Sequence, residues 1–165
     1  MGRDKAIVEV DGVAMAARVA AALRVAGCHP VFAVGGDQPA LEAMGIEFVT
    51  DLHPGEGPVG GVITALKACA PSAVVVVACD LPFLTAGTVS ALVEAANAAQ
   101  AVVAVTDRVQ PLCALWSQSA FDVLRREFDA GERRLLAVLD QLETRQIPAN
   151  PQDLANVNTP DDLPQ

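Results

Sequence analysis

The sequence predicts an α/β fold, a three-layer Rossmann-like arrangement in which helices cover both faces of a mostly parallel sheet. Apolar, β-branched runs alternate with alanine-rich segments of helical length along the 165 residues. The chain is 52% hydrophobic but only 4% aromatic, which is typical of a core built from Ala, Val and Leu beneath helices. Its length is that of one domain, so we expect a single unit over residues 1–165.

The first third of the chain already alternates helix and strand. An alanine-rich stretch without internal Gly or Pro predicts a helix over 14–26, which ends at Gly27. Short apolar runs at 30–34 and 46–50 predict two strands, with a short helix at 39–44 between them. This order is the beginning of a βαβ pattern.

The middle of the chain carries the longest loop and the most apolar run. The glycine-rich loop 51–61 leads into a helix expected over 62–70. Residues 73–78 are apolar and β-branched without alternation, which predicts a central strand covered on both faces. This strand ends at Asp80, and Thr85 can then cap a helix that extends to about residue 99.

The last third continues the alternation. Apolar runs predict strands at 101–105 and 112–116, separated by a short polar connection, and Ser117 can cap the helix that follows. The remaining expected elements are a helix with Phe121, Leu124 and Phe128 on one face, a helix over 132–141, short strands at 144–147 and 155–157, and a final turn capped by Asn158 or Thr159.

The negative net charge of the chain excludes some classes of binding partner. A formal net charge of −9 argues against nucleic acid or an anionic membrane surface, because both require clustered Lys and Arg. A small anionic ligand stays compatible, since a few local cations and backbone N–H groups outweigh the global field. Neither a signal peptide nor an apolar stretch of membrane-spanning length is found, so we expect a cytoplasmic protein with no membrane partner.

Cysteine and histidine are not predicted to carry chemistry. Neither C-x-x-C pairs nor histidines at ligand spacing occur, so we expect reduced thiols and no zinc site. We also expect His29 and His53 to be solvated loop residues. The four cysteines are Cys28, Cys69, Cys79 and Cys113.

Polar groups at the carboxyl ends of strands are the candidates for a site, because ligands of such sheets bind there. Asp80 has two readings of about equal weight: a turn or N-cap aspartate before Pro82, or a ligand of a hard cation such as Mg²⁺ that also contacts substrate phosphates. The run GEGPVGG can bring N–H groups to an anion or a purine, or it is a plain turn. Lys5 either neutralises phosphate charge or lies at an exposed terminus.

The order of several blocks resembles the molybdenum cofactor guanylyltransferase (MobA-like) family of nucleotide-sugar-transferase-like nucleotidyltransferases. The blocks are MGRDKAIVEVDG, DLHPGEGPVGGVITAL, VVVVACDLPFL, QPLCALW, AGERRLLAVL and NVNTPDDL, and together they cover essentially the whole chain. The most specific are M-G-x-D-K, C-D-x-P and the closing N-x-N-T-P.

The resemblance implies a reaction and a set of roles. GMP would pass from GTP to the terminal phosphate of molybdopterin, with release of pyrophosphate. Lys5 would contact the GTP phosphates, Asp80 would hold Mg²⁺, and Asp51 would help to bind the nucleotide. The residues implied beside Asp51 in the guanine pocket are Gly57, Pro58 and Gly60, and those implied near molybdopterin are Arg133, Arg134, Asn156 and Asn158. The resemblance also allows for transient contacts with proteins of cofactor biosynthesis or molybdoenzyme maturation.

The chain departs from the family pattern in two places. In the family, a strand and a segment of the form L-A-G-G-x-S-x-R precede M-G-x-D-K, so we expect the first strand and the first half of the phosphate loop to be missing and Met1 to be an internal residue. The missing strand would expose a strand edge and apolar helix faces. Ala33 stands where family members can carry an asparagine that touches nucleotide.

Two alternatives therefore stay open. One is a sibling enzyme that attaches CMP or activates another phosphorylated acceptor, although the tail NVNT favours the guanylyl member. The other is a binding or scaffold protein that keeps the fold without turning over Mg-GTP.

Overall fold

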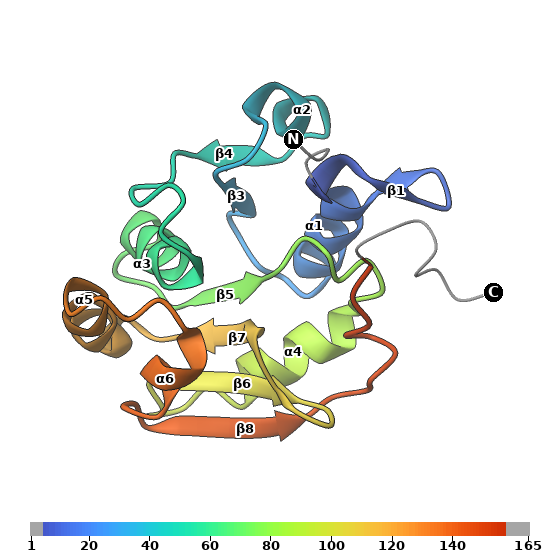
Figure 1. Ribbon diagram of the computed structural model, residues 1–165. Coiled ribbons are helices and arrows are strands. Elements are labelled where there is room, and N and C mark those ends of the chain that lie inside the picture. The colour runs from blue at the N-terminus through green and yellow to red at the C-terminus, as the bar shows by residue number, and fades with distance from the viewer. Residues whose placement is uncertain (1–4, 158–165) are drawn as a thin grey trace.

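The largest sheet has four strands in the order β5-β7-β6-β8 in the computed structural model, which describes residues 5–157 (Figure 1). The strand β7 is antiparallel to both β5 and β6, whereas β6 and β8 are parallel. Three strands thus point the same way and β7 points against them. The strands are β5 (Val74–Val77), β6 (Ala101–Val105), β7 (Val109–Trp116) and β8 (Thr144–Pro148).

A second, parallel pair of strands lies apart from this sheet. The strands β3 (Phe32–Val34) and β4 (Glu47–Val49) pair in register and are joined by the helix α2 (Gln38–Ala43). Asp37 caps α2, accepting a hydrogen bond from the amide of Ala40 at 3.1 Å. This βαβ unit confirms the predicted alternation.

Helices cover both faces of the four-stranded sheet, as Figure 1 shows. Along β6, Ala101 and Val103 pack into the cluster under α3, α5 and α6, while Val102 and Ala104 pack into the cluster under α1 and α4. Because all four side chains are fully buried, this strand needs apolar residues on both faces. The helices are α1 (Met15–Val25), α3 (Pro58–Ala68), α4 (Ala86–Glu94), α5 (Phe121–Asp129) and α6 (Leu135–Leu139).

The N-terminal part of the described chain contains a hairpin that the sequence analysis did not predict. A 3₁₀ turn, η1 (Lys5–Ile7), precedes the antiparallel strands β1 (Glu9–Val10) and β2 (Val13–Ala14). The turn between them holds Asp11 at φ 52° and Gly12 at φ 76°. Two consecutive left-handed residues define the type I′ turn that Asp-Gly favours in two-residue hairpins.

The predicted α/β class is confirmed, and the predicted caps at Gly27 (φ 83°) and Thr85, which accepts from the amide of Thr88, are confirmed as well. Ser117 caps a 3₁₀ turn, η2 (Gln118–Ala120), directly before α5. Several boundaries differ from the prediction: α3 begins at Pro58 rather than 62, α4 ends at Glu94 rather than 99, α6 is limited to Leu135–Leu139, and no strand forms at 155–157.

The run 73–78 is a strand, but its expected central position is wrong for the described chain. The strand β5 pairs only with β7 and forms an edge of the four-stranded sheet within residues 5–157. Its four valines are accordingly half-buried rather than fully buried. The expected cap at Asn158 or Thr159 lies outside the described residues.

Candidate active site

Lys5 and Asp80, predicted separately, lie together in the structure. The Nζ atom of Lys5 in η1 is 3.7 Å from Oδ2 of Asp80, which follows β5. The Lys5 side chain is half exposed, at 50%, whereas the Asp80 side chain is only 18% exposed. The tertiary fold thus brings a cation and a partly buried carboxylate to one place.

The second carboxylate oxygen of Asp80 bears on the two predicted interpretations of this residue. Oδ1 of Asp80 is buried and finds no hydrogen-bond partner among residues 5–157. The helix that follows is capped by Thr85, so Asp80 is not its N-cap. A buried oxygen without a partner is costly unless something outside the chain contacts it, and a cation suits a carboxylate. The cation-binding reading therefore fits this atom better than the turn reading.

A cation at Asp80 would need further ligands from elsewhere. Within residues 5–157, no group of three or more His, Cys, Asp or Glu side chains is placed to hold a metal ion. Mg²⁺ commonly binds through one or two carboxylates together with substrate phosphates. Asp80 fits a shared site of that kind rather than a site built by the protein alone.

The C-terminal segment of the described chain returns to Asp80. The amide of Val157 donates to the carbonyl oxygen of Asp80 at 3.0 Å. The preceding residue, Asn156, is exposed. Asn158 lies outside the described residues.

Asp51 organises the start of the glycine loop. Its Oδ1 accepts hydrogen bonds from the amide of His53 at 3.0 Å and from the hydroxyl of Thr64 at 3.1 Å. Thr64 is buried in α3, and its hydroxyl oxygen also accepts from the amide of Leu52 at 3.2 Å. Asp51 therefore ties the loop after β4 to the helix that follows it.

The glycines of this loop meet specific steric demands. Gly57 adopts φ 83° directly before Pro58, the first residue of α3, and this left-handed backbone favours glycine. At Gly60, an added Cβ would lie 2.7 Å from Cβ of His53. The loop therefore packs directly on the backbone of α3, where Gly60 is buried while Gly57 and Pro58 stay exposed.

His53 is not the solvated loop residue that we expected from the sequence. Its ring lies 4.5 Å, centroid to centroid, from the ring of Phe128 in α5, and the two planes are tilted by 52°. Its Nε2 atom is buried and has no hydrogen-bond partner in the part of the chain that the structure describes. The expectation was wrong because packing against α5 and Gly60 covers the ring, and a local sequence pattern does not show this contact. His29, by contrast, is exposed as expected.

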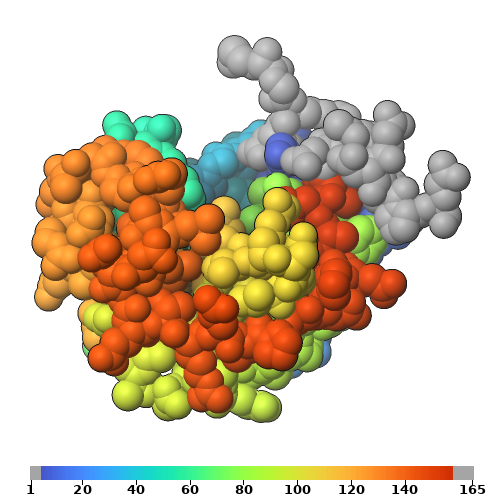
Figure 2. Space-filling model, turned by 60° about the horizontal axis from the view of Figure 1, so that its bottom comes forward, coloured from blue at the N-terminus to red at the C-terminus, as the bar shows by residue number. Residues whose placement is uncertain are grey.

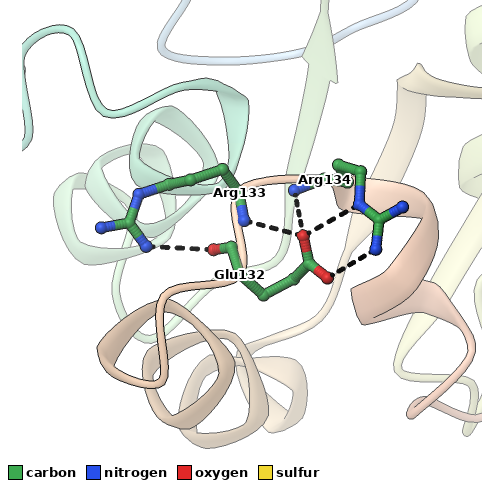
Figure 3. A network of polar contacts seen from close by, with 3 residues as sticks. All are labelled: Glu132, Arg133 and Arg134. Atoms are coloured by element: carbon green, nitrogen blue, oxygen red, sulfur yellow. Dashed lines mark hydrogen bonds and ion pairs between the residues drawn. The ribbon is translucent and has the colours of Figure 1, made fainter.

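The adjacent residues Arg133 and Arg134 point in different directions from one loop (Figure 3). Oε1 of Glu132 accepts from both of their backbone amides at 2.9 Å, and the carboxylate also binds the Arg134 side chain, with Oε2 3.1 Å from Nη2. The Arg133 side chain leaves toward the glycine loop, where it forms an ion pair with Glu56 at 2.8 Å. The two arginines therefore do not face a common ligand.

These contacts predict a pH dependence for Glu132. The Arg134 side chain, followed by the backbone amides of Arg134 and Arg133, lowers the pKa of Glu132 from 4.5 to about 2. A lowered pKa gives stability that is fully present above pH 4.5 and is lost as the pH falls toward about 2. Carbon-detected NMR titration should show this low pKa in the native protein and a higher one in Arg134→Met. A Glu132 pKa near 4.5 in the native protein would contradict the contact.

A shallow pocket of about 260 Å³ lies between α6 and β7, and the sequence analysis did not predict it. Figure 2 shows the orange surface around α6 adjoining the yellow surface of the β6–β7 hairpin, the elements that line most of it. Arg134 is its charged residue, and the other lining residues are Pro58, Pro111, Leu112, Leu135, Leu136 and Ala137. The lining residues lie in three of the blocks that carry the family resemblance, DLHPGEGPVGGVITAL, QPLCALW and AGERRLLAVL.

The Lys5–Asp80 pair and the loop of Asp51 are connected by packing around one apolar cluster. Ala6, next to Lys5, and Cys79, next to Asp80, pack in the same cluster as Ala33 of β3 and Phe48 of β4. At the end of β3, an added Cβ on Gly35 would lie 3.5 Å from Cβ of Asp51. The ends of β3, β4 and β5 are thus joined through shared packing.

Burial shifts the pKa of three of the four cysteine thiols. None of the four cysteines, all of which the structure describes, forms a disulfide, and burial raises the pKa of Cys113 to about 12, with a further contribution from the charge of Asp153. Burial also raises the pKa of Cys28 and of Cys69. Within the described part of the chain, no helix is long and apolar enough to cross a membrane.

Known proteins share both the sequence pattern and the fold. A probable molybdenum cofactor guanylyltransferase from Opitutus terrae is 34% identical over 173 residues, which cover 98% of this chain and 86% of that protein. The crystal structure of molybdopterin-guanine dinucleotide biosynthesis protein A from Archaeoglobus fulgidus superposes with a TM-score of 0.75 at 28% identity, covering 96% of this chain and 86% of that one.

A more distant structure shows the fold alone. Rv0371C from Mycobacterium tuberculosis, solved in complex with manganese, has a TM-score of 0.74 at 19% identity and covers 98% of this chain and 90% of that one. The family match is direct: residues 1–146 match the MobA-like NTP transferase domain. With this match and the relative from Opitutus terrae, the chain belongs to the MobA-like family of nucleotidyltransferases.

Proposed function

We propose that the protein transfers GMP from GTP to the terminal phosphate of molybdopterin, in a Mg²⁺-dependent reaction in the cytoplasm. An oxygen of the acceptor phosphate attacks the α-phosphorus of GTP, and the bond from that phosphorus to the bridging oxygen breaks, releasing pyrophosphate. The observation that carries the proposal is the Lys5–Asp80 pair with its buried, unpartnered carboxylate oxygen. The names of the Opitutus and Archaeoglobus relatives support the substrates.

Lys5 and Asp80 are assigned to the phosphates. Lys5 neutralises charge on the GTP phosphates, which compete with Asp80 for its ammonium group. Asp80 would hold Mg²⁺ through Oδ1, the atom that lacks a partner. When bound, Mg²⁺ would supply positive charge that offsets the charge developing on the phosphates. The acceptor phosphate is itself the nucleophile, so positioning and electrostatics suffice without a covalent enzyme intermediate.

The base and the acceptor are assigned to different surfaces. Asp51 and the loop with Gly57, Pro58 and Gly60 would hold the guanine, since Asp51 fixes the loop to α3 by accepting from the amide of His53 and from the hydroxyl of Thr64. Asn156 and Arg134 would hold the acceptor, because an amide and a guanidinium suit a hydrogen-bonding heterocycle and a phosphate. Asn158 is assigned with them from the sequence alone.

A competition assay tests the function and separates it from the alternatives. The protein is incubated with molybdopterin, Mg²⁺ and equal concentrations of GTP and CTP, and the products are identified by mass. We expect mainly the guanine dinucleotide together with pyrophosphate. The control variant Lys67→Met should give the same products as the native protein, because Lys67 is exposed in the last turn of α3. Predominance of the cytosine product would indicate the sibling enzyme, and binding of GTP without any transfer would indicate the binding protein.

A further inference from the structure

Arg133 connects its own loop to the glycine loop and to α5 through all three nitrogens of its guanidinium group. Its Nε and Nη2 contact Oε2 of Glu56, in the glycine loop, at 2.9 and 2.8 Å. Its Nη1 donates to the carbonyl oxygen of Phe128, the buried residue near the end of α5, at 2.7 Å. Arg133 is therefore bound on both sides before any ligand arrives.

The same guanidinium also packs on an aromatic ring. Its Cζ atom lies 3.9 Å from the centroid of the Phe128 ring, within the range of a cation–π contact. Phe128 in turn contacts the ring of His53, which packs against Gly60. An added Cβ on Gly57 would lie 3.6 Å from Cβ of Arg133, so the glycine and the arginine are in close contact. Arg133 thus touches the glycine loop both directly and through Phe128.

Arg134 differs from Arg133 in its exposure, its ion-pair partner and the surface that it lines. Its side chain is 80% exposed, compared with 36% for Arg133, and its ion-pair partner is Glu132, two residues earlier in the chain. It also lines the pocket between α6 and β7, which Arg133 does not. Figure 3 shows the two side chains diverging from the same short segment.

We propose that Arg133 is a positioning residue that holds the glycine loop in the shape that receives the nucleotide base, and that it does not bind the acceptor. This inference rests on the proposed function for the identity of the base. Its geometric part is independent of that function, because the contacts with Glu56 and Phe128 exist within the chain. It separates the two arginines, of which only Arg134 is left for the acceptor.

The guanidinium is suited to this role in a way that an ammonium group is not. One planar group donates along two edges, to a carboxylate on one side and a carbonyl on the other, while its face covers a ring. A lysine at position 133 would reach Glu56 or the carbonyl oxygen of Phe128, but not both. Arg133→Lys should therefore restore the function only in part.

Binding measurements by calorimetry test the assignment in the full chain. We expect Arg133→Met to weaken binding of Mg-GTP about tenfold and to reduce the preference for GTP over CTP. The KM for molybdopterin should change by less than about twofold, since no acceptor contact is removed. Arg133→Lys should be intermediate, and Arg126→Met, an exposed arginine of α5 paired with Glu127, should match the native protein. A raised KM for molybdopterin with unchanged GTP binding would overturn the proposal.

Hydrogen exchange without any ligand tests the geometric part separately. The amide of Glu56 donates to the carbonyl oxygen of His53 at 3.1 Å and reports the shape of the loop. Because opening frees this amide, we expect it to exchange about tenfold faster in Arg133→Met than in Arg134→Met. Amides of the core strand β6 should exchange at the same rate in both variants. Equal exchange at Glu56, or faster exchange throughout the protein, would overturn the proposal whether or not GMP transfer is found.

Discussion

Replacing Asp80 with asparagine is expected to reduce the rate of Mg²⁺-dependent transfer at least about a hundredfold, the size of effect seen when one stabilising group is removed from a transition state. Asparagine keeps the shape of the side chain but removes the charge that would hold the cation. Asp80→Ala should have the same effect. The measurement is the initial rate of pyrophosphate release at increasing Mg²⁺ concentration.

The fold of the Asp80 variants should stay intact. The native carboxylate has a buried oxygen without a partner, so removing the charge removes a desolvation cost and leaves the melting temperature unchanged or higher. Asp140→Asn is the matched control, because Asp140 is exposed at the end of α6. Normal turnover in Asp80→Asn at ordinary Mg²⁺ concentrations would remove Asp80 from the metal role.

Alanine at Gly60 and alanine at Gly61 are expected to have opposite effects, although both glycines lie in α3. On helix propensity alone, each substitution would stabilise the helix by about 0.5–1 kcal/mol. At Gly60 the new Cβ would lie 2.7 Å from Cβ of His53 and 3.4 Å from Cε2 of Phe128, whereas nothing lies within 4 Å at Gly61. Because Cβ of His53 is fixed to the backbone, the loop itself must move.

This displacement should reduce both stability and nucleotide binding. Overpacking of this kind costs about 1–3 kcal/mol, which exceeds the gain in helix propensity. We therefore expect Gly60→Ala to melt below the native protein and to bind Mg-GTP more weakly, and Gly61→Ala to melt at or above it with unchanged binding. Differential scanning calorimetry and GTP titration of the pair provide the measurement. Equal behaviour of the two variants would show that contact between the loop and α3 does not shape the site.

The sequence predicted those elements whose signal is local. The run AVVAV forms the strand β6 with the predicted bounds, because its four buried side chains need apolar residues on both faces. Gly27 and Thr85 end and begin helices as expected, since a C′ glycine and an N-cap hydroxyl act through the adjacent backbone. The start of α3 also has a local signal, because Pro58 occupies the first helical position. The glycines on both sides of Pro58 instead favoured the prediction of a loop to residue 61.

The strand β7 shows why other boundaries could not be found locally. Pro111 argues against a strand interior, because proline cannot donate to a sheet. The register between β6 and β7 shifts here, from Val103 opposite Ala114 to Ala104 opposite Gln110, so Pro111 falls in an irregularity where no ladder bond is needed. Recognising this requires the partner strand. The expected strand at 155–157 failed similarly, since Val157 pairs with Asp80 across a loop.

In the candidate site, too, the residue types could be predicted from the sequence, whereas their contacts could not. The residue types at Lys5, Asp51 and Asp80 could be selected from their positions and from the family resemblance. The contact of Lys5 with Asp80 and the packing of His53 on Phe128 depend on tertiary structure. Two adjacent arginines look alike in a sequence, and only the position of Glu56 and Phe128 distinguishes Arg133 from Arg134. Side-chain direction is the information that a single sequence lacks.

The most direct test of the site is a crystal structure of the protein with GTP and Mn²⁺, in which anomalous scattering locates the cation. We expect a Mn²⁺ peak at coordinating distance from Asp80, phosphates beside Lys5, and the guanine ring against the loop of Asp51 and Gly57. A cation that contacts the phosphates but lies away from Asp80, or a guanine ring bound elsewhere on the protein, would contradict this expectation.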